Sequence, residues 1–399
     1  MCVQISNYLK QLGFSTPMNI FKGVDDRIFT KKVTLTTKYT PDHLIGRDKE
    51  INKVASLFVP ALNGDEPDNA FIYGKTGVGK TATVKFVLLE LDHEVKKKMV
   101  PVKSVFVNCN QTNTTTRILK RICNVVAPEV EVPSTGLATS EYYQRLWDVL
   151  NEFKGVTIVV LDEVDKLEDD NILYNLPRAG ENLDITEGFV SILGISNDLT
   201  YKERLDARTL SSFGDTEYVF APYDANQLRE ILEERARQAF KDGVLDDTVI
   251  PLCAALAAQE HGDARKALML LRYAGDVAVE RGGDSVIESD VRDAQKWVES
   301  DKIAETIKTL PYHQKLVLSI IASFDGKEVG TNEIYAEYKR LCEGATPLSK
   351  ARVSSFISEL DMLGLVNSKK LYKGRQGRIR LVTSNVPREK VDGLLAEQS

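Results

Sequence analysis

The nine residues Tyr73–Thr81, which read YGKTGVGKT, constrain the fold of this chain more than any other stretch. They match the pattern G-x-x-x-x-G-K-[ST], with Lys80 and Thr81 at its last two positions. The apolar run Ala70–Tyr73 before the pattern is typical of a buried strand, and apolar residues recur at helical spacing after Lys80. A phosphate-binding loop lies between a strand and a helix in this way, so we expect a parallel α/β sheet.

The chemistry of this loop follows from its backbone. Glycines let it curl so that successive N–H groups face phosphate oxygens, and the start of the next helix adds partial positive charge. Lys80 supplies a charge for the β- and γ-phosphates, and the Thr81 hydroxyl can ligate Mg²⁺. The alternative is a glycine-rich loop with a chance lysine. The loop residues expected to contact ATP or ADP are Gly74, Lys75, Thr76, Gly77, Val78, Gly79, Lys80, Thr81 and Ala82.

Carboxylates follow a second strand. Val156–Leu161 is an unbroken apolar run, typical of a strand covered on both faces, and Asp162 and Glu163 come directly after it. Ligands bind at this end of parallel strands. We expect Asp162 to hold Mg²⁺ and Glu163 to polarise the attacking water; two solvated acids are the alternative. Asn197, after the apolar run Phe189–Ser196, is a candidate for positioning that water; a turn that opens with Asn197 and Asp198 is the alternative.

The segments around these strands predict mostly helices. Thr112–Ala127 and Ser140–Phe153 read as two helices that interrupt the strand–helix alternation. Tyr201–Ser212 reads as one short helix with two arginines, and Phe21–Leu35 as an extended segment that wraps the main domain. From Pro222 to Glu299 the pattern is wholly helical, with glycines between the helices.

Residues 302–399 form a separate module with 16 Lys and Arg against 11 Asp and Glu, in a chain whose formal net charge is −6. A basic module on an acidic body indicates contact with a polyanion. Three helices, at Thr306–Ser323, Thr331–Leu341 and Ser349–Leu363, precede the basic stretch Lys369–Arg380, which predicts a winged helix. The alternative use of such a domain is protein docking. The residues expected to contact DNA are Lys350, Arg352, Ser354, Ser355, Lys373, Arg375, Arg378 and Arg380.

Other features exclude several classes of protein. No apolar run approaches the roughly 20 residues of a membrane span, and the N-terminus lacks the pattern of a signal peptide. The five cysteines include no C-x-x-C pair, so we expect reduced thiols, most of them buried. We therefore expect a cytoplasmic, nucleoid-associated protein with no membrane partner.

Together these stretches resemble the archaeal origin-recognition and cell-division-control type replication initiators, which are AAA+ ATPases with a winged helix. The resemblance covers about residues 18–399. It rests on the stretches YTPDHLIGRDKEI, YGKTGVGKT, VVLDEVDKL, ILYNL, GISND, LDARTLSSF, FAPYDANQLREILEERA and GDARKAL. Asn171 is one departure, since the family often has Asp there.

The resemblance implies roles for individual residues. Asn197 matches the sensor that orients water. Arg265 matches the lid arginine that reaches the γ-phosphate, whereas from its own position it would be a solvated arginine on a helix face. Arg208 matches the arginine-finger region, which acts on the ATP of a neighbouring subunit, although Arg204 is close by. A segment at about 128–145 looks like the helical element with which initiators make a second DNA contact. The segment His43–Arg47 would border the adenine. The residues outside the loop that are expected to contact the nucleotide are His43, Leu44, Ile45, Arg47 and Tyr223.

The expected fold class is α/β: an AAA+ phosphate-loop domain with a parallel sheet in residues 1–221, including a helical insertion at about 112–153. A helical lid follows in residues 222–301, and an α+β winged-helix domain in residues 302–399. The expected function is an ATP-dependent DNA replication initiator that binds double-stranded origin DNA through the winged helix and the insertion. It would help recruit or load the replicative helicase, act with other initiator subunits, use ATP and ADP with Mg²⁺ as a switch, and hydrolyse ATP slowly.

Three other functions are compatible with parts of the pattern. A signalling ATPase would use the winged helix for protein contacts. A Holliday-junction motor or a clamp loader would turn over ATP faster and work as a ring. A transcription regulator with a vestigial ATP site is the third, and the complete set of ATPase residues argues against it.

Overall fold

The computed structural model describes residues 27–36, 39, 41, 43–342, 347–372 and 378–396. Of residues 301, 302, 370–372, 378, 379 and 396 it describes only the backbone. The chain forms two compact units, Met1–Val291 and Arg292–Ser399. The expected boundary at 301/302 falls within a single helix, α12 (Glu288–Thr309), which runs through the division between the units.

A five-stranded parallel sheet forms the centre of the first unit, as the sequence predicted. The strand order is β2-β3-β4-β1-β5, and β3 is buried along its whole length. A continuous apolar run is what such a central strand requires, because both of its faces are covered. The strands are β1 (Ala70–Tyr73), β2 (Val102–Asn108), β3 (Val156–Asp162), β4 (Phe189–Ser196) and β5 (Glu217–Val219).

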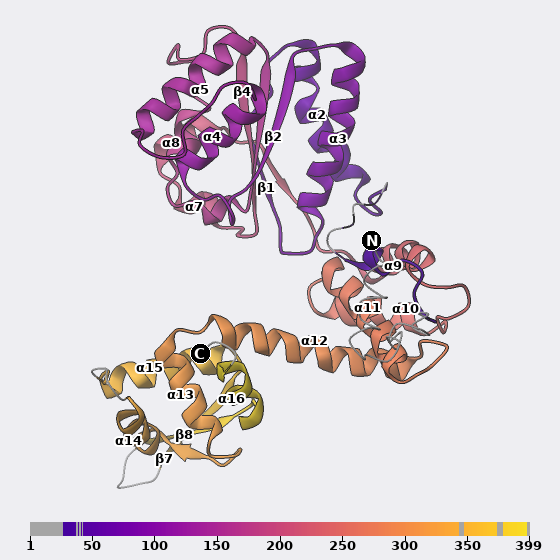
Figure 1. The fold of residues 1–399 in the computed structure, drawn as a ribbon, viewed down its shortest axis with the longest axis vertical. Coiled ribbons are helices and arrows are strands. Elements are labelled where there is room, and N and C mark those ends of the chain that lie inside the picture. Colours follow the sequence, from indigo (N-terminus) through magenta and orange to yellow (C-terminus); the bar gives the residue numbers. More distant parts are fainter. Residues whose placement is uncertain are drawn as a thin grey trace, which may run out of the picture. The chain divides into compact units, whose positions relative to one another are not determined.

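Helices cover both faces of this sheet (Figure 1). On one face, α2 (Asp48–Phe58) and α3 (Lys80–Lys98) enclose one apolar core. On the other face, the two helices of the predicted insertion, α4 and α5, enclose a second core together with α6 and α8. These helices are α4 (Thr115–Val126), α5 (Thr139–Phe153), α6 (Asn171–Asn175) and α8 (Ala207–Phe213). The link between α4 and α5 is irregular, so the segment 128–145 is helical only in its last part.

The expected single helix over Tyr201–Ser212 is two helices, α7 (Tyr201–Arg204) and α8. The break comes at Leu205, whose backbone is extended, and Asp206 then caps α8 by accepting from the N–H groups of Arg208 and Thr209. An aspartate that satisfies two free N–H groups is a strong helix start, so it ends one helix and begins another.

The first unit continues into the helical lid, formed by α9 (Ala225–Ala239), α10 (Val249–Gln259), α11 (Ala264–Glu280) and the start of α12. Contrary to expectation, the described part of the N-terminal segment packs on this lid. Phe29 forms a β-bridge with Phe240, and their rings lie 4.8 Å apart. The 3-10 helix Lys32–Leu35 also packs on the lid, where it contacts α9 and α11.

The second unit is a winged helix, as predicted. Its elements are α13 (Tyr312–Ala322), β6 (Val329–Gly330), α14 (Thr331–Leu341), α15 (Lys350–Met362), β7 (Val366–Tyr372), β8 (Arg378–Ser384) and α16 (Arg388–Ala396). The strands form an antiparallel sheet in the order β6-β8-β7, and Tyr372 pairs with Arg378 at the described end of the hairpin. The expected start of the helix Thr306–Ser323 is wrong, since α12 ends at Thr309 and α13 begins at Tyr312. Pro311 disfavours helix at the residue before it and so separates the two helices.

Cys109, Cys123, Cys253 and Cys342 are buried free thiols, which agrees with the expectation for these four residues. Among the described residues, no helix combines the length and the apolar character that crossing a membrane requires.

Candidate nucleotide-binding site

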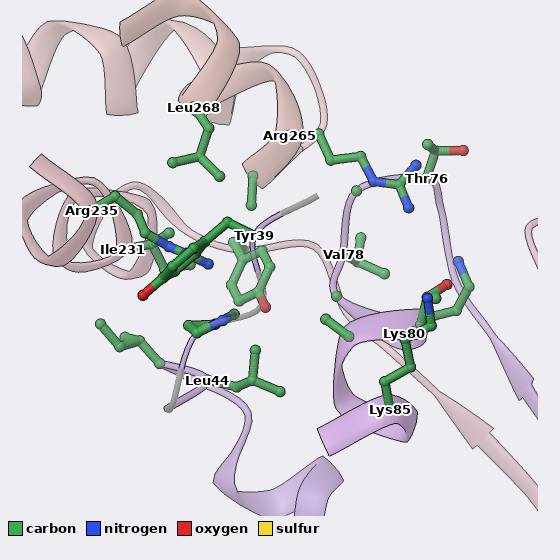
Figure 2. A pocket seen from close by; sticks show the side chains of 18 of the residues that line it. Tyr39, Leu44, Thr76, Val78, Lys80, Lys85, Ile231, Arg235, Arg265 and Leu268 are labelled. Atoms are coloured by element: carbon green, nitrogen blue, oxygen red, sulfur yellow. The ribbon is translucent and has the colours of Figure 1, made fainter. Parts of the chain in front are cut away.

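A cavity of about 290 Å³ in the first unit is lined by the phosphate loop, by residues after β3 and β4, by the N-terminal segment and by the lid. Figure 2 shows it with Lys80 and Lys85 at one end and with Arg235 and Tyr39 at the other. The predicted site residues that line it are His43, Leu44, Ile45, residues 76–82, Asp162, Glu163, Asn197, Tyr223 and Arg265.

The strand order explains why these residues meet. Strand β1 leads into the phosphate loop, β4 is its neighbour, and β3 is the neighbour of β4. All three run parallel, so their carboxyl ends reach the same edge of the sheet. Asp162 therefore contacts Thr81, although the two residues are 81 positions apart in the chain. In the same way Asn197 contacts Lys80, from which it is 117 positions away.

Two glycines of the loop allow close approach as well as positive φ angles. At Gly77, with φ of 78°, an added Cβ would lie 1.7 Å from Oδ1 of Asp263 in the lid. At Gly79, with φ of 88°, it would lie 2.5 Å from the hydroxyl of Tyr223. Any other residue would be strained at both positions and would push the lid away from the loop.

Lys80 is buried at the start of α3, and its ammonium group has three acceptors. Nζ donates to the carbonyl of Gly74 at 2.6 Å, to that of Lys75 at 2.9 Å and to Oδ1 of Asn197 at 2.9 Å. Burial is the main cause that lowers the pKa of Lys80 to about 8, with Asp162 acting against it. An anion next to this group would favour its charged form.

Thr81 and Asp162 fit a magnesium site. The Thr81 hydroxyl donates to Asp162 at 3.1 Å from both carboxylate oxygens. Burial raises the pKa of Asp162, whereas the hydrogen bond from Thr81 lowers it. Hydroxyl and carboxylate oxygens beside a phosphate loop are the ligands that Mg²⁺ takes with nucleotides, so the donor set suits this ion.

Glu163 adopts a left-handed backbone conformation, with φ of 56° and ψ of 46°. This region is uncommon for residues other than glycine and is sparsely populated because of steric strain. Strain of this kind concentrates at functional sites, where surrounding packing maintains it. At Glu163 it places an acid on the cavity wall directly after the buried Asp162.

The lid is joined to the phosphate loop by its own helix start. Asp263 caps α11 by accepting from the N–H groups of Arg265 and Lys266. The N–H of Ala264 donates to the carbonyl of Gly77 at 3.2 Å. This contact sets the start of α11 against the loop and brings Arg265 to the cavity wall (Figure 2).

Three of the residues predicted to contact the nucleotide lie outside the cavity wall. Gly74 and Lys75 contribute carbonyls to Lys80, as described above. Arg47, expected beside the base, is buried beneath the loop instead. It donates to the carbonyl of Val78 at 3.0 Å and to that of Ala221 at 2.7 Å, and its guanidinium lies 3.8 Å from the ring centroid of Tyr223. Arg47 thus connects the loop to the start of the lid.

No sequence motif predicted the wall of the cavity that lies away from the phosphate loop. The residues of α9 that line this wall face segments distant in sequence, so no local motif reveals them. The one available signal was that α9 belongs to a stretch that carries the family resemblance. The lining residues missed on that wall are Thr36, Tyr39, Pro41, Ile231, Glu234, Arg235 and Leu268. Lys85 and Ala264 were also missed, and they lie at the end of the cavity that the phosphate loop forms.

Arg208 is not part of this cavity wall. Its side chain is 79% exposed, and its guanidinium contacts Asp206 at 2.9 Å. Arg204 forms an ion pair with Asp198 instead. An exposed arginine on the surface of the subunit is the arrangement that action on a neighbouring subunit requires.

The predicted DNA-binding residues of the winged helix differ in how exposed their side chains are. Lys350 and Arg352 are exposed at the start of α15, whereas Ser354 and Ser355 are half-buried. Ser355 donates to Glu359 at 2.9 Å within the helix. Lys373 and Arg375 lie outside the described residues, and Arg378 begins β8 with its side chain not described.

Arg380, expected to contact phosphate, is used inside the domain. Its guanidinium donates to the carbonyl of Ser354 at 3.3 Å and to the hydroxyls of Ser358 and Ser368, each at 2.8 Å. The side chain is 15% exposed, with Asp361 at 3.8 Å. Arg380 therefore links α15 to the wing, and Ser354 lies on the side of α15 toward that link.

Three family models match this chain. An AAA domain matches residues 65–200, the Cdc6 AAA+ ATPase-type lid domain matches residues 229–296, and the CDC6 C-terminal winged helix domain matches residues 305–393. The chain is also similar to curated relatives over most of its length. It is 49% identical to an ORC1-type DNA replication protein of Thermococcus kodakarensis, over 90% of this chain and 89% of that protein. It is 43% identical to the ORC1-type DNA replication protein 1 of Methanosarcina mazei, over 93% of this chain and 91% of that protein.

Solved structures agree with this likeness. The ORC1 protein of Aeropyrum pernix, solved in complex with DNA, matches with a TM-score of 0.79 and 42% identity, over 94% of this chain and 98% of that chain. Cdc6p of Pyrobaculum aerophilum matches in fold, with a TM-score of 0.59 and 21% identity, over 93% of this chain and 99% of that chain.

Proposed function

Because the chain belongs to the family of ORC1-type DNA replication proteins, we propose that it binds double-stranded origin DNA and helps recruit or load the replicative helicase, with ATP and ADP as the states of a switch. The observation that carries this proposal is one cavity lined by Lys80, Thr81, Asp162, Glu163, Asn197 and Arg265, in a chain that also has a winged helix. The Aeropyrum pernix relative, solved with DNA, supports the choice of duplex DNA as partner.

In this proposal the chain's own residues bind and orient the nucleotide. The N–H groups of the phosphate loop and Lys80 hold the β- and γ-phosphates. Thr81 and Asp162 would hold Mg²⁺, which when bound would supply positive charge beside the phosphates. Glu163 accepts a proton from the attacking water, and Asn197 orients that water. Arg265 reaches the γ-phosphate from the lid, so the lid position depends on which nucleotide is bound.

Hydrolysis is expected to be slow in the isolated chain. An arginine supplied by a neighbouring subunit stabilises the transition state of phosphoryl transfer by several orders of magnitude in rate. Arg208 lies outside its own cavity wall and is exposed, so it is the candidate for that role in an adjacent initiator subunit. ATP then works mainly as a switch until initiator subunits assemble on DNA.

The test of the function as a whole is chromatin precipitation of the native protein followed by sequencing. We expect its binding sites to cluster at the positions where replication starts, because an initiator must occupy these before the helicase arrives. A mock precipitation with a non-specific antibody and a replication-start map made from sequence copy number are the controls. Binding sites spread over promoters with no enrichment at replication starts would favour a transcription regulator and would contradict the proposal.

DNA affinity is expected to reside mainly in the winged helix, at Lys350, Arg352, Lys373, Arg375 and Arg378, with a second contact from the AAA+ insertion. Each phosphate contact that is lost lowers the slope of log affinity against log salt by about 0.9. The double variant Arg375→Ala, Arg378→Ala should therefore weaken binding to all duplexes and flatten that slope by roughly two units if both side chains contact phosphate. Fluorescence anisotropy at several salt concentrations measures both quantities.

The matched control removes the same charge from the other unit. Lys97 and Lys98 are exposed at the end of α3, and their double alanine variant should leave affinity and slope unchanged. If the Arg375, Arg378 variant also behaves like the wild type, the wing does not contact DNA. The winged helix would then be a docking site for protein, as in the signalling ATPases.

A further inference from the structure

Arg235 is a buried arginine at the end of the cavity that lies away from the phosphate loop (Figure 2). It comes from α9 and is 7% exposed. Its Nη1 atom is buried and donates to no acceptor among the described residues. The large majority of buried side-chain polar atoms have a hydrogen-bond partner, so an unsatisfied donor on a cavity wall calls for an explanation.

The other contacts of Arg235 fix its orientation. Its guanidinium carbon lies 4.5 Å from the ring centroid of Tyr39, which also lines the cavity. The Tyr39 hydroxyl donates to Oε1 of Gln238 at 2.7 Å, which keeps the ring in place. Stacking on an aromatic ring leaves the N–H edge of a guanidinium available for hydrogen bonds in its plane. Tyr39 thus holds Arg235 in position and leaves Nη1 for a ligand.

Because Arg235 is charged, this wall of the cavity does not suit a purely apolar ligand group. Burial lowers the pKa of Arg235, and the neighbouring Glu234, which also lines the cavity, opposes this effect. Arginine nevertheless stays protonated in proteins and has donors only. A ligand group that satisfies Nη1 must therefore be a hydrogen-bond acceptor.

The position of the cavity identifies that acceptor. If phosphates occupy the loop around Lys80, the sugar and the base extend toward the wall that carries Tyr39 and Arg235 (Figure 2). The ring nitrogens N1, N3 and N7 of adenine are acceptors, whereas its exocyclic amino group is a donor and cannot pair with a guanidinium. We infer that Arg235 is a specificity-determining residue that donates from Nη1 to a ring nitrogen of adenine, an inference that rests on the proposed nucleotide-binding function.

The experiment measures the affinity of the full chain for ATP and for 1-deaza-, 3-deaza- and 7-deaza-ATP, each of which lacks one ring nitrogen. In the wild type, we expect one of the three analogues to bind about tenfold or more weakly than ATP, since a hydrogen bond from a charged donor is lost. Arg235→Met should bind ATP as weakly as the wild type binds that analogue, and should bind ATP and the analogue equally. Isothermal titration calorimetry gives all of these affinities.

Arg237→Met is the matched control, because Arg237 is exposed on the same helix and does not line the cavity. It should discriminate among the analogues as the wild type does. If Arg235→Met does not fold, Tyr39→Leu takes its place and should reduce the discrimination, because the guanidinium loses its stacking partner.

Two results would overturn the role of Arg235. One is a wild type that binds all three analogues as well as ATP, and the other is a folded variant, at Arg235 or Tyr39, that keeps the full discrimination. In either case ATP still binds to the wild type, and the proposed function stands. A wild type that binds no ATP at all would instead contradict the proposed function.

Discussion

Replacing Lys80 with alanine is expected to weaken ATP binding by about 10- to 100-fold, because a charge-assisted contact to the phosphates is lost. Hydrolysis should fall below detection at the nucleotide concentrations that saturate the wild type. The fold should persist, since the acceptors released by the change, Asn197 and two loop carbonyls, lie on or beside a cavity that water can enter. Calorimetric titration gives the affinity, and thermal unfolding without nucleotide checks the fold.

The pH dependence of ATP affinity shows how much the positive charge of Lys80, as distinct from the size of its side chain, contributes to binding. Burial lowers its pKa to about 8 without nucleotide, whereas phosphate favours the protonated form, so binding takes up a proton at high pH. The contribution of Lys80 to ATP affinity should therefore be constant well below pH 8 and fall as the pH rises through 8, toward about tenfold per unit. Lys80→Arg stays charged and should show no such fall. Wild-type affinity in the alanine variant would contradict the assignment of the phosphate loop.

Glu163→Gln is expected to keep ATP bound while lowering the rate of hydrolysis by at least about 100-fold, because the variant cannot accept a proton from water. The change keeps the size of the side chain and leaves Thr81 and Asp162, whose mutual contact does not involve Glu163. Release of phosphate under single-turnover conditions measures the rate, and binding of a fluorescent ATP analogue measures the affinity.

The neighbouring acid Asp165 provides the control for this prediction. Asp165 accepts from the hydroxyl of Ser196 at 2.9 Å and holds the end of β4, but it does not line the cavity. Asp165→Asn should therefore hydrolyse ATP much faster than Glu163→Gln. Any loss of rate in Asp165→Asn should be only the small one that a local distortion at the end of β4 causes. Normal hydrolysis in the Glu163 variant would mean that another group accepts the proton.

Several parts of the molecule were predictable from the sequence because their chemistry is local in the chain. The phosphate loop is nine consecutive residues whose backbone must curl, and its glycines are required at Gly77 and Gly79 by positive φ angles. The acids after β3 follow a run of apolar residues that only a central strand can bury. The winged helix was predictable in the same way, from three helical patterns followed by a basic hairpin.

Other features depend on which elements pack together, and the sequence pattern does not contain that information. Arg47 was expected beside the base and lies beneath the loop, and Arg380 was expected on phosphate and links α15 to the wing. Each is an arginine with backbone or hydroxyl acceptors from other elements, so its role depends on where those elements lie. The far wall of the cavity is the extreme case, because it joins Tyr39 to Arg235 across almost 200 residues.

The sequence by itself thus determined the fold class, the phosphate-binding end of the site and the presence of the winged helix. In these parts the functional groups are adjacent in the chain or follow directly from a strand end. Only the tertiary structure decided where the base end of the cavity lies and which charged side chains are buried in contacts within the protein. A buried charge is stabilised by partners that the fold brings to it, and those partners come from segments whose packing no local pattern specifies.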